Sequence, residues 1–398
     1  MTRGGWVELD VFCELQPGRE PDGPEAAAFL AETIEQAQLA DEQGFGCWWT
    51  VEHHSAPDFS ISSAPDLLLA VLSQHTRRMR LGTAGILSPF EINHPVRVAE
   101  RAAFVDVLSG GRLDLGLARS GGAEWEAFGV DPESTREQMR QAFRMLPRIW
   151  TGEEFEWQSE LLRVPPRCFA PRPIQQPHPP LWQTVSGPES CEAAGQLGVG
   201  MLASACLSPL DHVVRSLEFY DRGLAACDEP VGATVNAQRA IFVLFHCAES
   251  REAAVASGAG EAALWFMNTA PRIFRVDRTN WLNIVRGVMT GEATTAILEG
   301  EESGPSEAEL DDPVPVIRLM NRQRAGLPLD PAEVQAALDP IPTAVIGDVE
   351  ECRVKLRKIA ETGVDRLMCL MQFGELPHAR VLDSIRNAGK HLIPELHS

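Results

Sequence analysis

The chain has 398 residues, 44% of them hydrophobic, and a formal net charge of −21 at pH 7. A surface this acidic argues against nucleic acids and anionic membranes as partners, because phosphate groups bind basic patches. None of the nine cysteines forms a CxxC pair, the first residues show no signal-peptide core, and no apolar run reaches the ~18 residues of a membrane span. We therefore expect a cytoplasmic protein with reduced thiols.

Apolar runs typical of strands alternate with amphipathic stretches along most of the chain, which predicts parallel βα units. The predicted elements, in chain order, are strand 6–14, helix 24–43, strand 46–51, helix 65–75, strand 79–87, helix 96–108, strand 113–118, helix 133–150, strand 181–185, helix 189–197, strand 199–205, helix 210–224, strand 240–247, a helix from 251, helix 349–362 and strand 366–373. Eight such strands predict an α/β fold, a closed (β/α)8 TIM barrel.

Two segments depart from the alternation. The proline-rich residues 165–180 are expected to form an extended connection over the surface, since proline is excluded from helix interiors and central strands. Residues 268–344 are interpreted as an insertion near strands seven and eight of one domain, 1–398. Its acidic run, 291–313, is polar and highly charged. The insertion is either a mobile lid over the active site or a solvated linker between extra helices.

The motif VEHHS ends the second predicted strand and places His53 and His54 at the barrel rim where active sites are built. Neighbours on a strand point to opposite faces, so one imidazole can face the barrel mouth while the other packs behind it. Either ring could instead be a hydrogen-bonded structural histidine. A metal site is not predicted, because two strand neighbours cannot easily share an ion and no other ligand spacing is present.

The third strand ends in LGTAGIL, whose small residues Ala84 and Gly85 would let a flat ring approach the backbone. The alternative is a tight bend between strand and loop. Asn93 and His94 precede Pro95, the start of the next helix, and either face the site or cap that helix.

Two anion-binding groups follow the next two strands. Arg119 is succeeded by Ser-Gly-Gly, and Ser186 and Gly187 open the helix after the fifth strand. A guanidinium and a helix N-terminus both favour phosphate, and on adjacent strands they could grip one phosphate from two sides. Arg119 could also be a surface residue beside a turn. There is no P-loop, and no GxGxxG follows the first strand.

The segments GFGCWWTVEHHS, RLGTAGIL, NHPVRVAERAAFVDVLSGGRLDLGLAR, WTGEEFE, PRPIQQPHPPLW and SGPES together resemble the bacterial luciferase-like flavin-dependent monooxygenases. The resemblance runs from Val7 to about Phe373. It implies a usually dimeric TIM barrel that receives reduced FMN from a separate NAD(P)H-dependent flavin reductase. The flavin reacts with O2 to form a C4a-hydroperoxide, which transfers one oxygen atom to a small organic substrate, possibly of secondary metabolism.

By position, His53 resembles the catalytic histidine of that family and His54 its structural companion. Ala84–Gly85 matches a non-proline cis peptide under the flavin ring, while Arg119 and Ser186 match phosphate ligands. Two departures stand out: Ala118 replaces the reactive cysteine of the light-emitting enzymes, and Glu189 lies where a hydroxyl is common, so that Ser190 takes that role. An apolar, dry mouth would be formed by Phe12, Trp48 or Trp49 and Phe373, with His54 and Asn93 beside it.

Two other functions stay open at this point. An F420-dependent oxidoreductase would share the barrel but transfer hydride, although its polyglutamate tail would be repelled by a chain of charge −21. A non-catalytic flavin-binding subunit is the second alternative, which the presence of both His53 and Arg119 disfavours.

Overall fold

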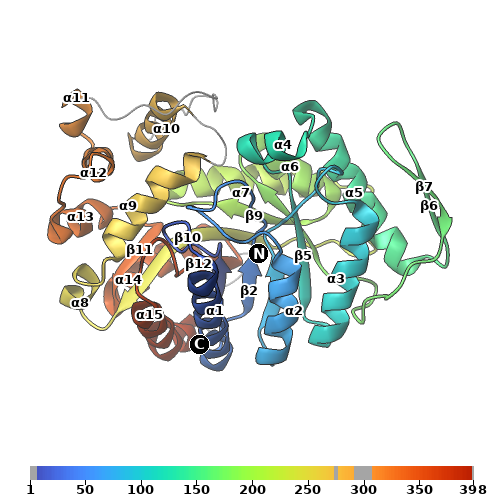
Figure 1. The fold of residues 1–398 in the computed structure, drawn as a ribbon, viewed down its shortest axis with the longest axis horizontal. Helices are drawn as coiled ribbons and strands as arrows, with labels where there is room; N and C mark the ends of the chain where they lie inside the picture. The colour runs from blue at the N-terminus through green and yellow to red at the C-terminus, as the bar shows by residue number, and fades with distance from the viewer. Residues whose placement is uncertain (1–6, 273–276, 291–306, 397–398) are drawn as a thin grey trace.

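The computed structural model describes residues 7–272, 277–290 and 307–396, in which eight parallel strands form a closed barrel surrounded by helices (Figure 1). The ring closes because β12 pairs with both β10 and β1. Around the ring the strands are β1 (Glu8–Cys13), β2 (Cys47–Thr50), β3 (Arg80–Thr83), β5 (Leu113–Ala118), β8 (Leu181–Val185), β9 (Gly200–Ser204), β10 (Arg239–Ala248) and β12 (Arg366–Leu370). The predicted TIM barrel is confirmed.

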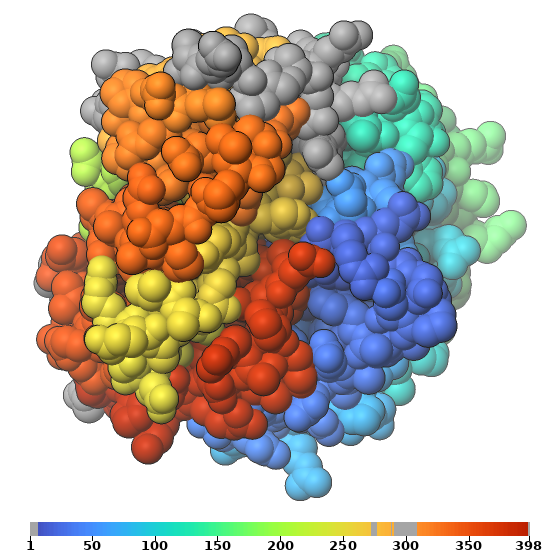
Figure 2. Space-filling model, turned by 60° about the vertical axis from the view of Figure 1, so that its left-hand side comes forward, coloured from blue at the N-terminus to red at the C-terminus, as the bar shows by residue number. Residues whose placement is uncertain are grey.

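Helices follow the strands and pack on the outside of the barrel. They are α1 (Gly23–Gln43), α2 (Pro65–His75), α3 (Pro95–Ser109), α5 (Thr135–Thr151), α6 (Pro188–Leu197), α7 (Leu210–Ala225), α14 (Val349–Ala360), α15 (His378–His391) and the short α16 (Ile393–Leu396). Local sequence sets their ends. Helix α1 begins at a capping box of Asp22 and Glu25 and ends at Gly44, whose φ of 90° is readily adopted only by glycine. Helix α15 packs against α1, so the first helix of the chain and the last long helix lie side by side (Figure 2).

Several predicted elements are interrupted. The strand expected at 79–87 divides into β3 and β4 (Ile86–Leu87), and the peptide bond between Ala84 and Gly85 is cis. A helix that the sequence reasoning missed, α4 (Gly122–Phe128), and the 3-10 turn η1 (Pro132–Ser134) come before α5. The helix expected from residue 251 divides into α8 (Arg251–Val255) and α9 (Ala259–Thr269).

A two-stranded hairpin, also not predicted, projects beside α5 (Figure 1). It consists of β6 (Phe155–Gln158) and β7 (Arg163–Arg167), paired antiparallel. Strand β7 contains Pro165 and Pro166, which an edge strand tolerates because one of its sides needs no ladder hydrogen bonds. The proline-rich connection therefore begins inside a strand.

The region after β10 is helical. It contains η2 (Ala270–Arg272), α10 (Arg278–Thr290), α11 (Glu307–Leu310), α12 (Pro315–Arg324) and α13 (Pro331–Leu338). Helices α12 and α13 pack on α9, where the orange segments of Figure 2 cover the yellow ones. A further strand, β11 (Ala344–Asp348), pairs with the end of β10 and was missed. Residues 291–306 of the acidic run lie outside the described residues, so the lid stays a prediction.

Polar side chains fill the barrel interior on the side away from the C-terminal ends of the strands. Asp10 pairs with Arg366 at 2.6 Å and accepts a hydrogen bond from the indole of Trp49 at 2.8 Å. The Trp49 ring meets Trp182 edge to face at 5.1 Å. These groups close the interior below the C-terminal rim. No helix of the described residues is long and apolar enough to cross a membrane.

Candidate active site

The two histidines at the end of β2 lie against a buried carboxylate that comes from α4. Nδ1 of His53 is 3.1 Å from Oε1 of Glu124, and the backbone N–H of His54 donates to the same oxygen at 2.7 Å. The hydroxyl of Ser120 donates to the other oxygen. The Glu124 side chain is 1% exposed and that of His53 is 15% exposed. One carboxylate thus orients both the imidazole and the backbone that carries it.

Electrostatics favour an ionised pair. Burial raises the pKa of Glu124, but hydrogen bonds from His53, Ser120 and the His54 amide, with the charge of His53, lower it below its usual value. Burial lowers the pKa of His53, but the hydrogen bond and charge of Glu124, helped by Glu14 and Glu52, raise it above its usual value. An ionised Glu124 only accepts, so Nδ1 of His53 carries the proton and Nε2 is left for the site.

His54 and Asn93 belong to a second network behind the strand end. Nε2 of His54 is 3.2 Å from Glu52, and the Asn93 amide donates to both Glu52 oxygens at 2.9 and 3.0 Å. Arg101 donates to Oδ1 of Asn93 at 2.6 Å and pairs with Asp66 at 3.3 Å. The polar atoms of Asn93 are therefore hydrogen-bonded within the protein. His94 caps α3 by accepting from the amide of Val96. His94 thus caps the helix, one of the alternatives left open by the sequence, whereas Asn93 binds Glu52 and Arg101.

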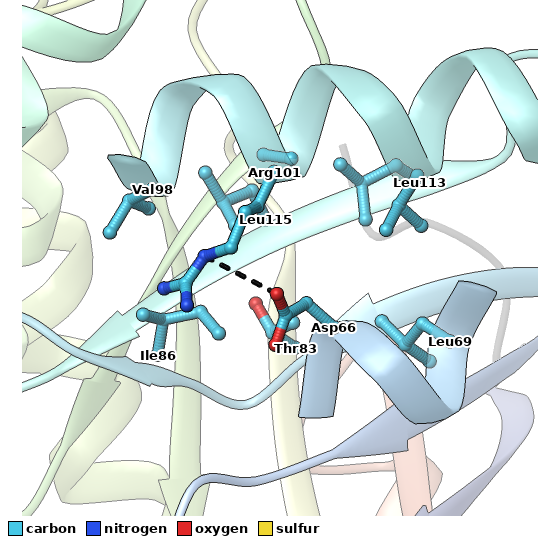
Figure 3. Close-up of a pocket in the computed structure, with 10 residues that line it drawn as sticks. Asp66, Leu69, Thr83, Ile86, Val98, Arg101, Leu113 and Leu115 are labelled. Carbon is cyan, nitrogen blue, oxygen red and sulfur yellow. Dashed lines mark ion pairs between the residues drawn. The ribbon is translucent and has the colours of Figure 1, made fainter. Parts of the chain in front are cut away.

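The ion pair of Asp66 and Arg101 joins α2 to α3 beside a cavity of about 10 Å³ (Figure 3). Apolar side chains such as Ile86, Val98 and Leu115 line it. A space of this size holds about one water molecule, so no organic ligand fits. We assign it to packing under the rim, not to binding.

Glycines make a flat shelf at the end of β3. A Cβ on Gly82 would lie 2.2 Å from the Trp49 ring, and one on Gly85 would lie 2.7 Å from the backbone of Gly116. A Cβ on Gly116 in turn would lie 2.2 Å from the carbonyl oxygen of Thr83. Strands β3 and β5 therefore approach so closely that no side chain can stand between them. Ala84 joins the shelf and hydrogen-bonds to the Thr50 carbonyl at 2.7 Å.

Arg119 and the N-terminus of α6 lie on neighbouring strands, because β5 pairs with β8. Among the described residues no carboxylate pairs with the Arg119 guanidinium, which lies 5.7 Å from the centre of the Trp125 ring. Burial and the nearby Arg136 both lower its pKa. The Ser190 hydroxyl accepts from the amides of Ser186 and Gly187 at 3.0 and 3.1 Å. Ser190 thus folds back over the helix start.

Glu189, the departure from the family pattern, lies at the same helix start but points to another partner. Its exposed carboxylate pairs with Arg136 at 2.8 Å. The negative charge is thereby offset by a second arginine from α5.

The predicted aromatic residues lie on or just after neighbouring strands. Phe12 stacks on Phe242 at 4.7 Å, and its register partner on β2 is Trp49, whose indole donates to Asp10. Phe373 follows the end of β12 and is fully buried.

Other aromatic rings, which the sequence reasoning missed, form a row of contacts that starts at His53. Phe59 meets the imidazole edge to face at 5.8 Å and lies 5.8 Å from Phe266, which in turn lies 6.4 Å from Phe242. Phe59 belongs to the loop after the histidines, and Phe266 to α9. The spacing of such residues along the sequence carries no signal of their proximity. Glu124, Glu14 and Gln16 were missed for the same reason. No cluster of three or more potential metal ligands occurs in the described part of the chain.

Comparison with known proteins gives a consistent family. The family model described as luciferase-like monooxygenase matches residues 7–366. The oxygenase component of flavin-dependent trigonelline monooxygenase from Acinetobacter baylyi is 39% identical over 195 residues, 48% of this chain and 52% of that protein. The 4-hydroxyprotoasukamycin monooxygenase of Streptomyces nodosus subsp. asukaensis is 30% identical over 59% of this chain and 64% of its own length. The alignments thus span about half to two thirds of these relatives.

Solved structures share the fold over nearly the whole chain. A monooxygenase from Streptomyces bottropensis has a TM-score of 0.72 at 22% identity and covers 98% of this chain and 99% of its own. The oxygenating constituent of 3,6-diketocamphane monooxygenase from Pseudomonas putida, solved with FMN, has a TM-score of 0.71 at 17% identity, with coverage of 98% and 99%. An F420-dependent tetrahydromethanopterin reductase from Methanopyrus kandleri has a TM-score of 0.64 at 16% identity, with coverage of 98% and 100%.

Proposed function

The chain belongs to the luciferase-like monooxygenase family, and we propose that it is the oxygenase component of a two-component monooxygenase. In this proposal it receives reduced FMN from a separate NAD(P)H-dependent flavin reductase, and O2 and a small organic substrate react at the barrel rim. One observation carries the proposal. The imidazole of His53, hydrogen-bonded to Glu124, follows β2, and the Arg119 guanidinium, with no carboxylate partner among the described residues, follows β5; β3 with its glycines lies between these two strands.

The donor set at the rim fits the phosphate of FMN. The Arg119 guanidinium has no carboxylate partner in the described chain, the Ser186 side chain is exposed, and the N-terminal end of α6 favours an anion. Arg119, Ser186, Gly187 and Ser190 would hold the phosphate. Ala84 and Gly85, which follow β3 at the rim, would lie under the flavin ring.

Reduced FMN, when bound, supplies the electrons that activate O2. The protein supplies orientation, proton control and exclusion of water. Glu124 fixes the tautomer of His53, so that Nε2 can hold or move a proton at the reacting oxygen. Phe59, Phe242 and Phe266 keep that region apolar. The named substrates of the relatives differ, so the proposal is confined to the transfer of one oxygen atom.

Phosphate recognition can be tested with a matched pair of ligands. The wild-type protein should bind reduced FMN more tightly than reduced riboflavin, which lacks the phosphate, in anaerobic titrations. Arg119→Ala should weaken FMN binding by roughly 10- to 100-fold, the loss of a charge-assisted hydrogen bond, and leave riboflavin binding unchanged. Arg140→Ala removes an exposed arginine that pairs with Glu137 in the same helix and serves as the control. Equal loss with both ligands would refute the assignment.

The reaction itself is tested by incubating the protein with reduced FMN, O2 and a substrate panel, with 18O2 incorporation as the readout. His53→Ala should bind FMN normally but form no oxygenated product. Unchanged turnover would refute the role of His53. Hydride transfer from reduced F420 without O2 uptake would replace the oxygenase with the F420-dependent alternative, and FMN binding without any turnover would favour a non-catalytic subunit.

We further propose that the chain forms a homodimer through α2 and α3. These packed helices expose five large apolar side chains, namely Leu67, Val71, Phe104, Val107 and Leu108, with Leu67 at 66% and Phe104 at 57%. Apolar groups gathered on one face mark an interaction site. The ion pair of Asp66 and Arg101 joins the same helices to the network behind the histidines.

Light scattering or sedimentation measures this directly. Phe104→Glu should convert the dimer to a folded monomer, because a charge would be buried in the interface. Val235→Glu alters an exposed apolar residue before β10, far from α2 and α3 in the chain, and should leave the dimer intact. A wild-type monomer, or an unchanged dimer in Phe104→Glu, would contradict the proposal.

A further inference from the structure

Helix α4 contacts both halves of the proposed site through two consecutive residues. Glu124 accepts from the imidazole of His53, with 3.1 Å between Oε1 and Nδ1. The next residue, Trp125, donates from its indole Nε1 to the carbonyl oxygen of Arg119 at 2.8 Å. A helix of seven residues thus links the residues that follow β2 to the residues that follow β5.

Helix α4 is held at both ends. The hydroxyl of Ser120, just before the helix, donates to Glu124, and the φ of Ser120 is 71°. A non-glycine residue adopts such a φ only where neighbouring contacts enforce it. The helix ends at Gly129, and just before this end the Phe128 ring meets the His54 ring edge to face at 4.9 Å. The middle of the helix is therefore fixed by contacts on both sides.

The Arg119 guanidinium lies over the ring of Trp125, with 5.7 Å between its central carbon and the ring centre. The face of an indole attracts a cation within about 6 Å of its centre. No carboxylate pairs with this guanidinium in the part of the chain that the structure describes. The positive charge of Arg136 lowers the pKa of Arg119, so the two arginines repel each other. The indole is thus the attractive contact that keeps the Arg119 side chain in place.

Fixing this side chain matters for binding. An arginine side chain has many rotamers, and a ligand binds more weakly when only a fraction of the molecules presents the rotamer that binds it. The indole of Trp125 contacts both the backbone carbonyl and the guanidinium of Arg119, so it restrains the side chain at both ends. The same helix orients His53 through Glu124. One short helix therefore orients both groups to which the proposed function assigns a role.

We propose that Trp125 is a positioning residue for the phosphate site, whose indole keeps the Arg119 guanidinium oriented to bind a phosphate monoester such as the tail of FMN. That Arg119 binds this phosphate rests on the function proposed above. The contact between indole and guanidinium belongs to the protein without cofactor. In this proposal Trp125 does not touch the phosphate, so its substitution acts through Arg119.

The test compares reduced FMN with reduced riboflavin in anaerobic titrations. Trp125→Leu should weaken FMN binding by roughly 2- to 30-fold, the range for the loss of a cation–π contact, and leave riboflavin binding unchanged. Trp125→Phe keeps a ring under the guanidinium and loses the indole N–H, so its loss should be smaller. Trp157→Leu is the matched control, because Trp157 lies 5.3 Å from another arginine, Arg148, on the projecting hairpin. It should change neither affinity.

A double-mutant cycle separates positioning from a general loss of packing. In the Arg119→Ala background, Trp125→Leu should cause no further loss of FMN binding, because the residue through which it acts is absent. An additive loss, an equal loss with riboflavin, or wild-type FMN binding by a folded Trp125→Leu would overturn the inference. If Trp125→Leu does not fold, Trp125→Phe takes its place in the cycle and the same outcomes decide.

The results also separate this inference from the proposed function. A loss confined to FMN in Trp125→Leu, without oxygenation by the wild type, would support the inference and fault the oxygenase alone. A loss confined to FMN in Arg119→Ala, with no effect of Trp125→Leu, would fault the inference alone. Wild-type FMN affinity in both variants would fault the assignment of the phosphate to Arg119 and overturn this inference with it.

Discussion

Glu124 offers the sharpest test of how the site is built, because one buried carboxylate supports three groups. It accepts from the imidazole of His53, from the amide of His54 and from the hydroxyl of Ser120. Glu124→Ala would leave these donors buried around an empty space. Breaking a buried charged pair in this way costs about 3–5 kcal/mol of unfolding free energy. Glu124→Gln keeps an oxygen for the His54 amide and should cost only about 1–3 kcal/mol.

The pH dependence of that cost follows from the two shifted pKa values. The pKa of Glu124 is lowered on folding, so its stabilisation is present above the unfolded value of ~4.3 and is lost as pH falls through the folded value. The pKa of His53 is raised, so its stabilisation is present below ~6.5 and is lost as pH rises through the folded value. The difference in unfolding free energy between wild type and Glu124→Gln should therefore be largest between about pH 4.3 and 6.5.

In Glu124→Gln we expect product formation to be reduced more strongly than the free energy of unfolding. Without the carboxylate, only the charges of Glu14 and Glu52 oppose burial, so the pKa of His53 falls, and the tautomer is no longer fixed. Product formation by Glu124→Gln should drop on the order of 100-fold, within the range of general acid–base catalysis, while FMN affinity stays unchanged. Urea unfolding across pH and oxygenation assays measure both effects. Glu126→Gln changes an exposed carboxylate on the same helix and is the control. Wild-type turnover in a folded Glu124→Gln would refute the role assigned to this pair.

Two further predictions concern the barrel. His246 is 2% exposed on β10, and burial lowers its pKa to about 4, so the unfolded chain takes up a proton before the folded one does; stability should fall as pH drops from ~6.5 towards 4, by about 2 kcal/mol between pH 7.5 and 5. His246→Gln should remove that share of the pH dependence in urea unfolding, and an unaltered dependence would contradict it. Gly116→Ala should cost at least about 1–3 kcal/mol, because its Cβ would strike the Thr83 carbonyl, whereas Gly23→Ala, with open space around its Cβ, should be neutral in thermal unfolding.

The residues at the rim could be predicted because the end of each strand is marked by the local sequence. His53, Ala84, Arg119 and Ser186 each follow an apolar run, and in a parallel barrel such positions meet at one end. The alternation of apolar and amphipathic stretches therefore gave the fold class and the residues that we propose for the rim. It gave no distances, so it could not predict which side chains contact one another there.

The missed elements had weaker local signals. Strand β11 is a short apolar run directly before the cap of α14, and it pairs only with the end of β10, outside the ring of eight. The hairpin of β6 and β7 contains two adjacent prolines, which count against strand formation until the strand is known to lie at an edge. Both depend on where a strand lies in the sheet, and the sequence pattern alone does not specify that.

The partners of His53 were hidden for a different reason. Glu124 lies 71 residues away in the chain, on a helix of seven residues between Gly121 and Gly129, where a loop is the simpler interpretation. Glu14 directly follows β1, whose inward face, with Asp10 and Phe12, was not assigned. An imidazole draws its properties from groups that the fold collects from separate strands and helices. The sequence motif thus points to the side chain that we propose as the reacting group, while its pKa is decided by tertiary neighbours that only the closed barrel brings within reach.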